Sequence, residues 1–249
     1  MPIGPARLYH VNNNCSDLAR STAFYAEHLG LRTAVRTAVD PQPCAALGLD
    51  LGGWDAWMLA DAAPGDGALV DLLQWLTPGP TGRPAGPGDL GYTTLVFESP
   101  TTPPGHLVDP DGTLLEVRAG EQPRFAAVKV GVRDVDAAAE WWSEVVGLRA
   151  DDGVLTDDRG PDSFAVELVA VPDPGRAAPP SSTANRLGLY RMALLTRSIV
   201  DDHRFLLDRG VTCLSGVEDL RVGPDLPVVR VLCFLDPDGT VIELIESPV

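Results

Sequence analysis

Residues 109–116 read Asp-Pro-Asp-Gly-Thr-Leu-Leu-Glu, and residues 236–243 read Asp-Pro-Asp-Gly-Thr-Val-Ile-Glu. Asp, Pro and Gly favour a tight turn, and the apolar runs on either side favour strands. The chain therefore contains the same hairpin twice. Each hairpin carries a glutamate, Glu116 or Glu243, within an apolar strand. An unpaired buried carboxylate is costly, so both glutamates are candidate functional residues.

A helical pattern also repeats. Asp17 and Asp134 each precede a segment whose apolar residues recur every three or four positions, and Gly30 and Gly147 follow 13 residues after them. Asp is a favourable N-cap and Gly a favourable residue just after a helix C-terminus. A third such segment runs from Ser198 to Gly210, with Asp201 completing an S-x-x-D start. Three helices of similar length are predicted.

The repeats divide the chain into four units, about 7–76, 90–119, 125–171 and 187–247. Unit two has the hairpin but lacks the helix. Pro- and Gly-rich connectors lie at 77–89 and 172–186. We place a domain boundary after residue 120, which gives a first domain of residues 1–120 and a second of residues 121–249. Each domain is expected to contain two units.

The bulk composition narrows the class of protein. The net charge is −16 over 249 residues, which opposes binding to nucleic acid or to anionic lipid. No apolar run approaches the roughly 20 residues that span a bilayer, and the N-terminus lacks the apolar core of a signal peptide. The four cysteines are scattered without C-x-x-C spacing. We therefore expect a cytoplasmic protein with a small-molecule partner, no nucleic acid and no membrane.

Several of these residues together carry a family resemblance. The segments Tyr9-His10-Val11, Phe24-Tyr25 and Leu29-Gly30-Leu31, with the Asp-Pro-Asp-Gly-x-x-x-Glu ending, resemble the vicinal-oxygen-chelate superfamily of glyoxalases, bleomycin-resistance proteins and extradiol dioxygenases. The abundance of Ala, Gly, Pro, Asp and Arg suggests an actinobacterial-type member. The resemblance implies an α+β fold of tandem βαβββ modules, paired into U-shaped half-barrel sheets, with the second module lacking its helix.

The resemblance also implies positions for metal ligands on the first and last strand of each module. In the first half these positions carry His10, Asp71, Thr94 and Glu116, and in the second Ala127, Glu167, Arg191 and Glu243. One imidazole and two carboxylates suit a divalent ion such as Mn²⁺, Fe²⁺, Zn²⁺ or Ni²⁺. We therefore predict one metal ion held by His10, Asp71 and Glu116 in the first domain. In the second domain Arg191 would repel a cation, so no metal is expected there.

The remaining site residues follow from strand alternation and from the same positions. Alternation places Lys129 on the face of Ala127, so Lys129, Glu167, Arg191 and Glu243 are expected to converge as acid–base residues. Glu116 is expected to act as a catalytic base or a ligand. Expected residues of the cavity wall are Asn12, Asn14, Trp57 and Thr94, although core packing is an equal reading of Trp57.

Three functions remain open. The first is a metal-assisted lyase or isomerase of specialised metabolism that acts on an oxygen-rich substrate, and we favour it over a dioxygenase. The second is a metal-free protein that binds an antibiotic for self-resistance, and the third is a metal-free acid–base enzyme of natural-product biosynthesis. The helix missing from unit two also leaves an apolar sheet face around Leu95, Phe97 and Leu107. The chain termini, the 77–89 connector or a homodimer partner should cover that face.

Overall fold

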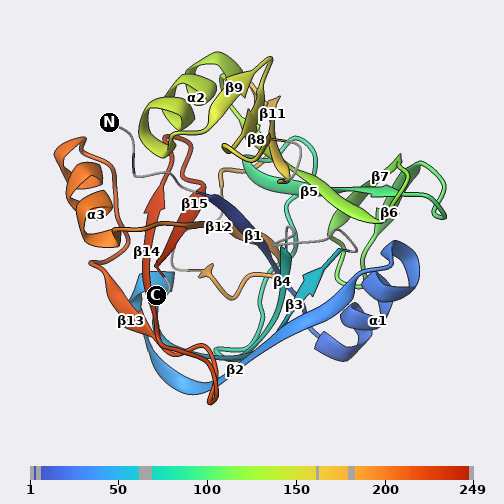
Figure 1. The fold of residues 1–249 in the computed structure, drawn as a ribbon, viewed down its shortest axis with the longest axis horizontal. Coiled ribbons are helices and arrows are strands. Elements are labelled where there is room, and N and C mark those ends of the chain that lie inside the picture. The colour runs from blue at the N-terminus through green and yellow to red at the C-terminus, as the bar shows by residue number, and fades with distance from the viewer. Residues whose placement is uncertain (1–2, 4–6, 62–68, 161–162, 179–182, 247–249) are drawn as a thin grey trace.

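The computed structural model describes residues 3, 7–61, 69–160, 163–178 and 183–246. Two mixed β-sheets pack against each other, with helices at their margins (Figure 1). The helical segments are α1 (Leu18–Leu29), η1 (Ala45–Leu47), α2 (Val135–Trp141), its widened last turn η2 (Trp142–Val146) and α3 (Ile199–Asp208). No described helix is long and apolar enough to cross a membrane.

The larger sheet, sheet A, has the strand order β13-β14-β15-β12-β1-β4-β3-β2. Its strands are β1 (Arg7–Asn14), β2 (Arg32–Cys44), β3 (Leu49–Ala60), β4 (Leu69–Thr77), β12 (Gly188–Leu195), β13 (Glu218–Leu220), β14 (Val229–Leu235) and β15 (Val241–Glu246). It joins unit one to unit four through the antiparallel pair β1 and β12. The sheet curves until its two edges approach each other (Figure 1).

The smaller sheet, sheet C, has the strand order β6-β7-β5-β8-β11-β10-β9. Its strands are β5 (Gly91–Ser99), β6 (Gly105–Val108), β7 (Leu114–Ala119), β8 (Arg124–Val132), β9 (Arg149–Asp151), β10 (Val154–Thr156) and β11 (Ala165–Ala170). It joins unit two to unit three through β5 and β8. The modular α+β fold and the missing helix of unit two are thus confirmed.

The pairing of the units differs from our expectation. We predicted that units one and two would share one half-barrel and units three and four the other. The strands instead pair unit one with four and unit two with three, so the two halves of the chain are interleaved. The boundary after residue 120, as a division of the chain, stays a prediction. The consequence for the site is direct, because first-half and second-half residues meet on one sheet.

The outer face of unit two is covered from within the chain. Leu95 and Phe97 are fully buried in a core that includes apolar residues of both sheets. The ring of Tyr25, on α1, lies 6.3 Å from that of Phe97, and Leu107 packs against the same core. Helix α1 and sheet A therefore cover this apolar face, which we expected the chain termini, the 77–89 connector or a second subunit to cover. A homodimer is not needed for this purpose.

The predicted ends of the first two helices are confirmed in detail, whereas Ser198 at the start of the third makes no side-chain capping bond. The carboxylate of Asp17 accepts from the backbone N–H of Arg20 at 3.0 Å, and that of Asp134 accepts from Ala137 at 3.0 Å. Gly30 and Gly147 adopt left-handed conformations, with φ of 67° and 85°. Residues with a Cβ rarely tolerate that region, which explains why glycine ends both helices.

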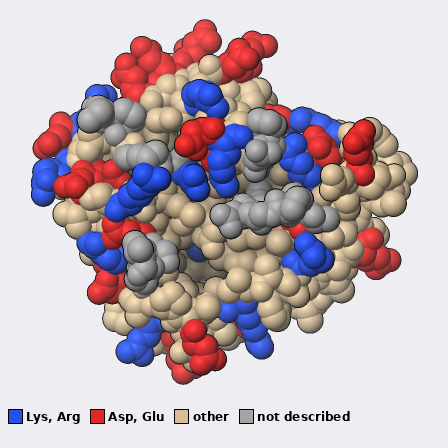
Figure 2. Space-filling view, in the orientation of Figure 1, with Lys and Arg blue, Asp and Glu red and all other residues tan. Residues whose placement is uncertain are grey.

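The surface carries both signs of charge. On the face shown in Figure 2, acidic and basic side chains lie interspersed over the molecule. The chain still carries a net charge of −16. This distribution gives no support to binding of a polyanion on that face.

The two Asp-Pro-Asp-Gly turns share a backbone but differ in their surroundings. Asp109 Oδ1 accepts from the backbone N–H of Asp111 and Thr113, and Asp236 Oδ1 accepts from the equivalent Asp238 and Thr240. Asp109 Oδ2 also accepts from the Asn13 amide at 3.0 Å and the Tyr25 hydroxyl at 3.2 Å. Burial raises the pKa of Asp236 to about 6.

Because of this contrast, replacing the first Asp of the turn by Asn should have opposite effects on stability in the two turns. A carboxyl whose pKa is higher in the folded state costs stability as the pH rises from its unfolded value, 3.8, to about 6. Asp236→Asn keeps the accepting oxygen and removes the buried charge, so it should raise the free energy of unfolding above pH 6 and leave it unchanged below pH 3.8. Asp109→Asn should instead lower the free energy of unfolding by about 1–3 kcal/mol, because the Asn13 amide and the Tyr25 hydroxyl would lose their carboxylate acceptor. Urea denaturation at pH 7.5 and pH 3.5 measures both, and a destabilised Asp236→Asn at pH 7.5 would contradict this prediction.

Candidate functional site

Four neighbouring strands at the centre of sheet A each contribute one polar side chain to the concave face. His10 lies on β1, Asp71 on β4, Arg191 on β12 and Glu243 on β15. These strands follow one another in the order β15-β12-β1-β4, so the four side chains come from adjacent positions. All are buried, from 2% exposed for His10 to 4% for Arg191. We call this set the four-residue cluster.

The guanidinium of Arg191 joins the two carboxylates of this cluster. Its Nε donates to Glu243 Oε2 at 2.8 Å, and its Nη2 donates to Asp71 Oδ2 at 3.4 Å. His10 Nε2 lies 3.7 Å from the same Glu243 oxygen and 4.0 Å from the same Asp71 oxygen. The imidazole is therefore close to both carboxylates but beyond hydrogen-bond distance.

The charges in the cluster are strongly coupled. Burial alone would raise the pKa of Glu243, but the charge of Arg191 and the proximity of His10 outweigh burial and lower that pKa to about 2. Burial alone would lower the pKa of Arg191, but the negative charges of Glu243 and Asp71 raise it instead. Glu243 and Arg191 thus remain an ion pair at neutral pH.

Several buried polar atoms in this region have no hydrogen-bond partner among the residues that the structure describes. They are Arg191 Nη1, Asn12 Oδ1 and both ring nitrogens of His10. Asn12 Nδ2 donates to Asp71 Oδ2 at 3.2 Å, which holds that carboxylate in place. A buried donor without a partner costs about 1–3 kcal/mol, so these atoms are well placed to bind a polar ligand group.

The cluster forms the polar end of an otherwise apolar cavity of about 270 Å³. Its aromatic and large apolar wall residues include Tyr9, Trp54, Met58, Leu73, Leu195 and Leu226. A concave apolar cavity with a few convergent polar groups is the usual form of a small-molecule site. This cavity combines both features.

The donor set does not fit the divalent ion that the family resemblance implies. The two carboxylate oxygens nearest His10 are the same atoms that Arg191 contacts. A divalent ion bound to them would lie close to a buried guanidinium, and like charges repel strongly in a buried environment. Within the described residues no group of three or more His, Cys, Asp or Glu side chains is arranged to hold a metal.

A second polar cluster lies on sheet C. Lys129 Nζ is 2.5 Å from Glu116 Oε2. Arg118 donates from Nε to Glu116 at 2.7 Å, and from Nη1 and Nη2 to the two carboxylate oxygens of Glu167 at 2.7 and 2.9 Å. Burial alone would raise the pKa of Glu116, but the hydrogen bonds from Lys129 and Arg118 outweigh burial, so the pKa is lower than usual. A cleft of about 470 Å³ beside them is also lined by Thr94 and His106. These four charges neutralise one another.

The predicted site residues are therefore distributed differently from our expectation. His10 and Asp71 lie together, but Glu116 is on the other sheet and cannot complete their ligand set. Likewise Lys129 and Glu167 are apart from Arg191 and Glu243, so the predicted convergence of these four is wrong. The interleaved pairing of the units explains both differences. Sequence reasoning missed Arg118, although alternation places it on the same face as Glu116.

The predicted wall residues also divide. Asn12 contacts Asp71, and Thr94 lines the sheet C cleft. Asn14 Nδ2 instead donates to the backbone oxygens of Ala184 and Arg186 at 2.7 and 2.6 Å. Trp57 lies outside the cavity, with Arg36 over its ring at 5.8 Å. Trp54 lines the cavity in its place, because residues three apart on a strand point to opposite faces.

Comparison with solved structures identifies the fold. Glyoxalase I of Zea mays superposes with a TM-score of 0.68 at 16% identity, covering 97% of this chain and 92% of that one. A Bacillus subtilis protein described as a candidate dioxygenase gives 0.66 at 14% identity, covering 99% and 87%. Comparisons with protein-family models and with curated protein sequences gave no match. The chain therefore shares the fold of glyoxalase I, and its activity must be inferred from its own residues.

Proposed function

We propose that this chain is a metal-independent acid–base enzyme that acts on a small, largely apolar carbonyl compound in the sheet A cavity. The observation that carries the proposal is the position of Arg191. Its guanidinium holds both carboxylates of the four-residue cluster and leaves Nη1 without a partner beside an apolar cavity. A fixed cation at this point can polarise a carbonyl oxygen.

The cluster supplies groups for proton transfer next to that carbonyl. Arg191 Nη1 would donate to the carbonyl oxygen and stabilise the enolate that forms when a neighbouring carbon loses its proton. His10, whose two ring nitrogens have no hydrogen-bond partner among the described residues, would accept that proton. The products of this step are an enolate and an imidazolium.

Charge balance favours His10 as the base. With a neutral imidazole, two carboxylates face one guanidinium, so the cluster carries one excess negative charge. After the transfer the imidazolium would face both carboxylates, because Glu243 and Asp71 are within about 4 Å of Nε2, and the enolate would face Arg191. This chemistry is of the lyase or isomerase type. Asp71 and Glu243 position Arg191 and stabilise the imidazolium.

Exchange of α-protons in D₂O tests the proposal directly. Small ketones from 2-butanone to 2-octanone, incubated with the protein, should lose their α-proton ¹H NMR signals faster than in buffer with bovine serum albumin. The reason is that enolate formation must precede incorporation of deuterium. Ketones that bind without accelerated exchange would contradict the enzymatic proposal.

That contrary outcome would favour the second candidate, a protein that sequesters a small apolar compound such as an antibiotic. Its support is the apolar lining, including Trp54 and Tyr9, around a small polar end. A role in specialised metabolism and a homodimer stay predictions. The metal-assisted version has less support, because Arg191 occupies the carboxylates that a metal would need.

A further inference from the structure

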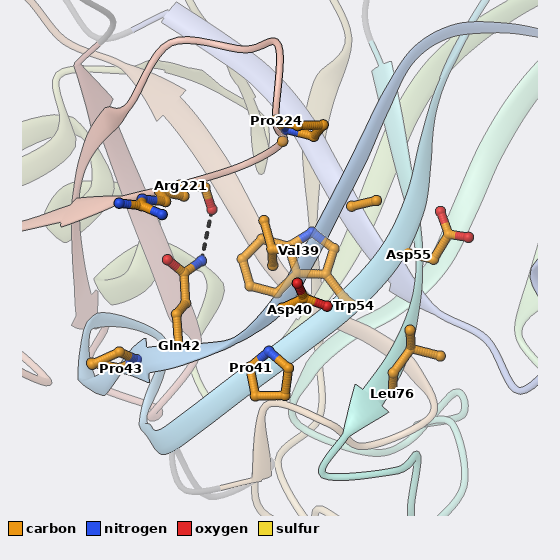
Figure 3. Close-up of a pocket in the computed structure, with 12 residues that line it drawn as sticks. Val39, Asp40, Pro41, Gln42, Pro43, Trp54, Asp55, Leu76, Arg221 and Pro224 are labelled. Atoms are coloured by element: carbon orange, nitrogen blue, oxygen red, sulfur yellow. Dashed lines mark hydrogen bonds between the residues drawn. The ribbon is translucent and has the colours of Figure 1, made fainter.

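Trp54 forms part of the wall of two separate hollows. It lines the inner cavity of about 270 Å³, and it also lines an outer cleft of about 720 Å³ that contains Asp40, Gln42 and Pro224. Figure 3 shows the indole at the centre of this cleft. The side chain itself is buried, at 4% exposed. Among the residues that the structure describes, it alone is shared by the linings of these two hollows.

A loop segment forms a further part of the partition. The 221–228 segment, which follows β13, closes the gap between the two edges of sheet A. Ala38 N donates to Val222 O at 3.1 Å, and Gln42 Nε2 donates to Arg221 O at 2.7 Å (Figure 3). Residues of this segment line both hollows, with Val222 and Leu226 at the inner cavity and Arg221 and Gly223 at the outer cleft.

Trp54 is held firmly in this position. Its Nε1 donates to Thr37 Oγ1 at 3.1 Å, and its ring lies 5.6 Å from that of Trp75 in an edge-to-face contact. Trp75 is in turn fixed by a hydrogen bond from its Nε1 to Asn14 Oδ1 at 3.0 Å. A side chain anchored at both its polar and apolar ends makes a rigid wall.

We propose that Trp54 sets the maximum length of the ligand, by separating the inner cavity from the outer cleft. The inference rests on the proposed function, because it takes the polar head of the ligand to lie at Arg191 and the apolar tail to point away from it. At roughly 30 Å³ for each water-sized group, 270 Å³ holds about nine non-hydrogen atoms. The substrate class is therefore a short-chain carbonyl compound with a tail of about six carbons.

A homologous series of 2-alkanones, from 2-butanone to 2-dodecanone, tests this length limit. Isothermal titration calorimetry should show the dissociation constant falling about fourfold for each added CH₂ (~0.8 kcal/mol) up to about 2-octanone. Longer members should bind more weakly to the wild-type protein, because their tails meet Trp54. In Trp54→Leu the affinity should continue to rise through 2-dodecanone.

Trp57→Leu is the matched control, since it removes the same ring three residues along β3, on the face outside the cavity. It should show the length limit of the wild type. A wild-type series without a limit, or an unchanged limit in Trp54→Leu, overturns the proposal. If Trp54→Leu does not fold, Trp54→Phe, which keeps an aromatic ring but removes the second ring of the indole, replaces it: the limit should move to a longer ketone, and an unchanged limit overturns the proposal.

A second series separates this proposal from the proposed function. In 2-methyl-1-alkenes a CH₂ group replaces the carbonyl oxygen while the shape is kept. A shared length limit with tighter binding of the ketones supports both proposals. A shared length limit with equal binding of ketones and alkenes supports the role of Trp54 and contradicts the carbonyl site at Arg191. Tighter binding of ketones without a length limit supports the carbonyl site and contradicts the role of Trp54. Binding of neither series overturns both.

Discussion

Arg191→Met is expected to lower the free energy of unfolding by about 3–5 kcal/mol at pH 7. The guanidinium is the group that bridges Glu243 and Asp71, and both carboxylates are at most 3% exposed. Methionine leaves these two buried charges facing each other without a cation. Removal of one partner of a buried ion pair is costly for this reason, whatever the net value of the intact pair.

Urea denaturation of the wild type and the variant measures this effect. Arg118→Met is the matched control, because Arg118 also joins two carboxylates but its side chain is 40% exposed. Solvent-exposed pairs contribute about 0–1 kcal/mol, so this variant should change little. Equal losses in the two variants would show that Arg191 has no special place in the buried cluster.

The loss of stability in Arg191→Met should also depend on pH. The pKa of Glu243 is lowered from 4.5 to about 2, so its stabilisation is fully present above pH 4.5 and is lost as the pH falls towards 2. The difference in stability between wild type and Arg191→Met should therefore shrink over that window. A difference that stays constant down to pH 2.5 would contradict the assignment of the lowered pKa to Arg191.

His10→Gln is expected to slow ketone α-proton exchange by about 10²–10⁴-fold, the usual contribution of a general base. The fold should survive, because neither ring nitrogen of His10 has a hydrogen-bond partner among the described residues. His106→Gln serves as control, since His106 lies beside Glu116 in the sheet C cleft. ¹H NMR exchange rates and melting temperatures should be measured for both. Unchanged exchange in His10→Gln would assign the base elsewhere.

Much of the fold could be predicted because its signals are local. The N-cap at Asp17, the left-handed Gly30 and the Asp-Pro-Asp-Gly turns each depend on a few consecutive residues. The partners of the units could not be predicted in this way. β1 pairs with β12, about 180 residues further along the chain, and nothing in either strand alone specifies that partner over β5.

The site was predicted residue by residue but not as an assembly. His10, Asp71, Arg191 and Glu243 were all identified by position, yet His10 and Asp71 were grouped with Glu116 because unit two follows unit one in sequence. Trp57 is predicted as a wall residue, but Trp54 lines the cavity instead, because the sequence does not specify the register of β3 and a shift of one residue exchanges the two faces. Long-range pairing and register, rather than local propensity, decided both outcomes.

The rate of ketone α-proton exchange before and after removal of metal ions is the most direct test of the central claim that Arg191 serves in place of a metal. The protein should be dialysed against EDTA, its residual metal content measured by plasma mass spectrometry, and Mn²⁺, Fe²⁺, Zn²⁺ and Ni²⁺ added back singly. The account predicts the same exchange rate in all samples, with no increase in melting temperature on addition of any ion. A rate that falls on chelation and returns with one of these ions would contradict it.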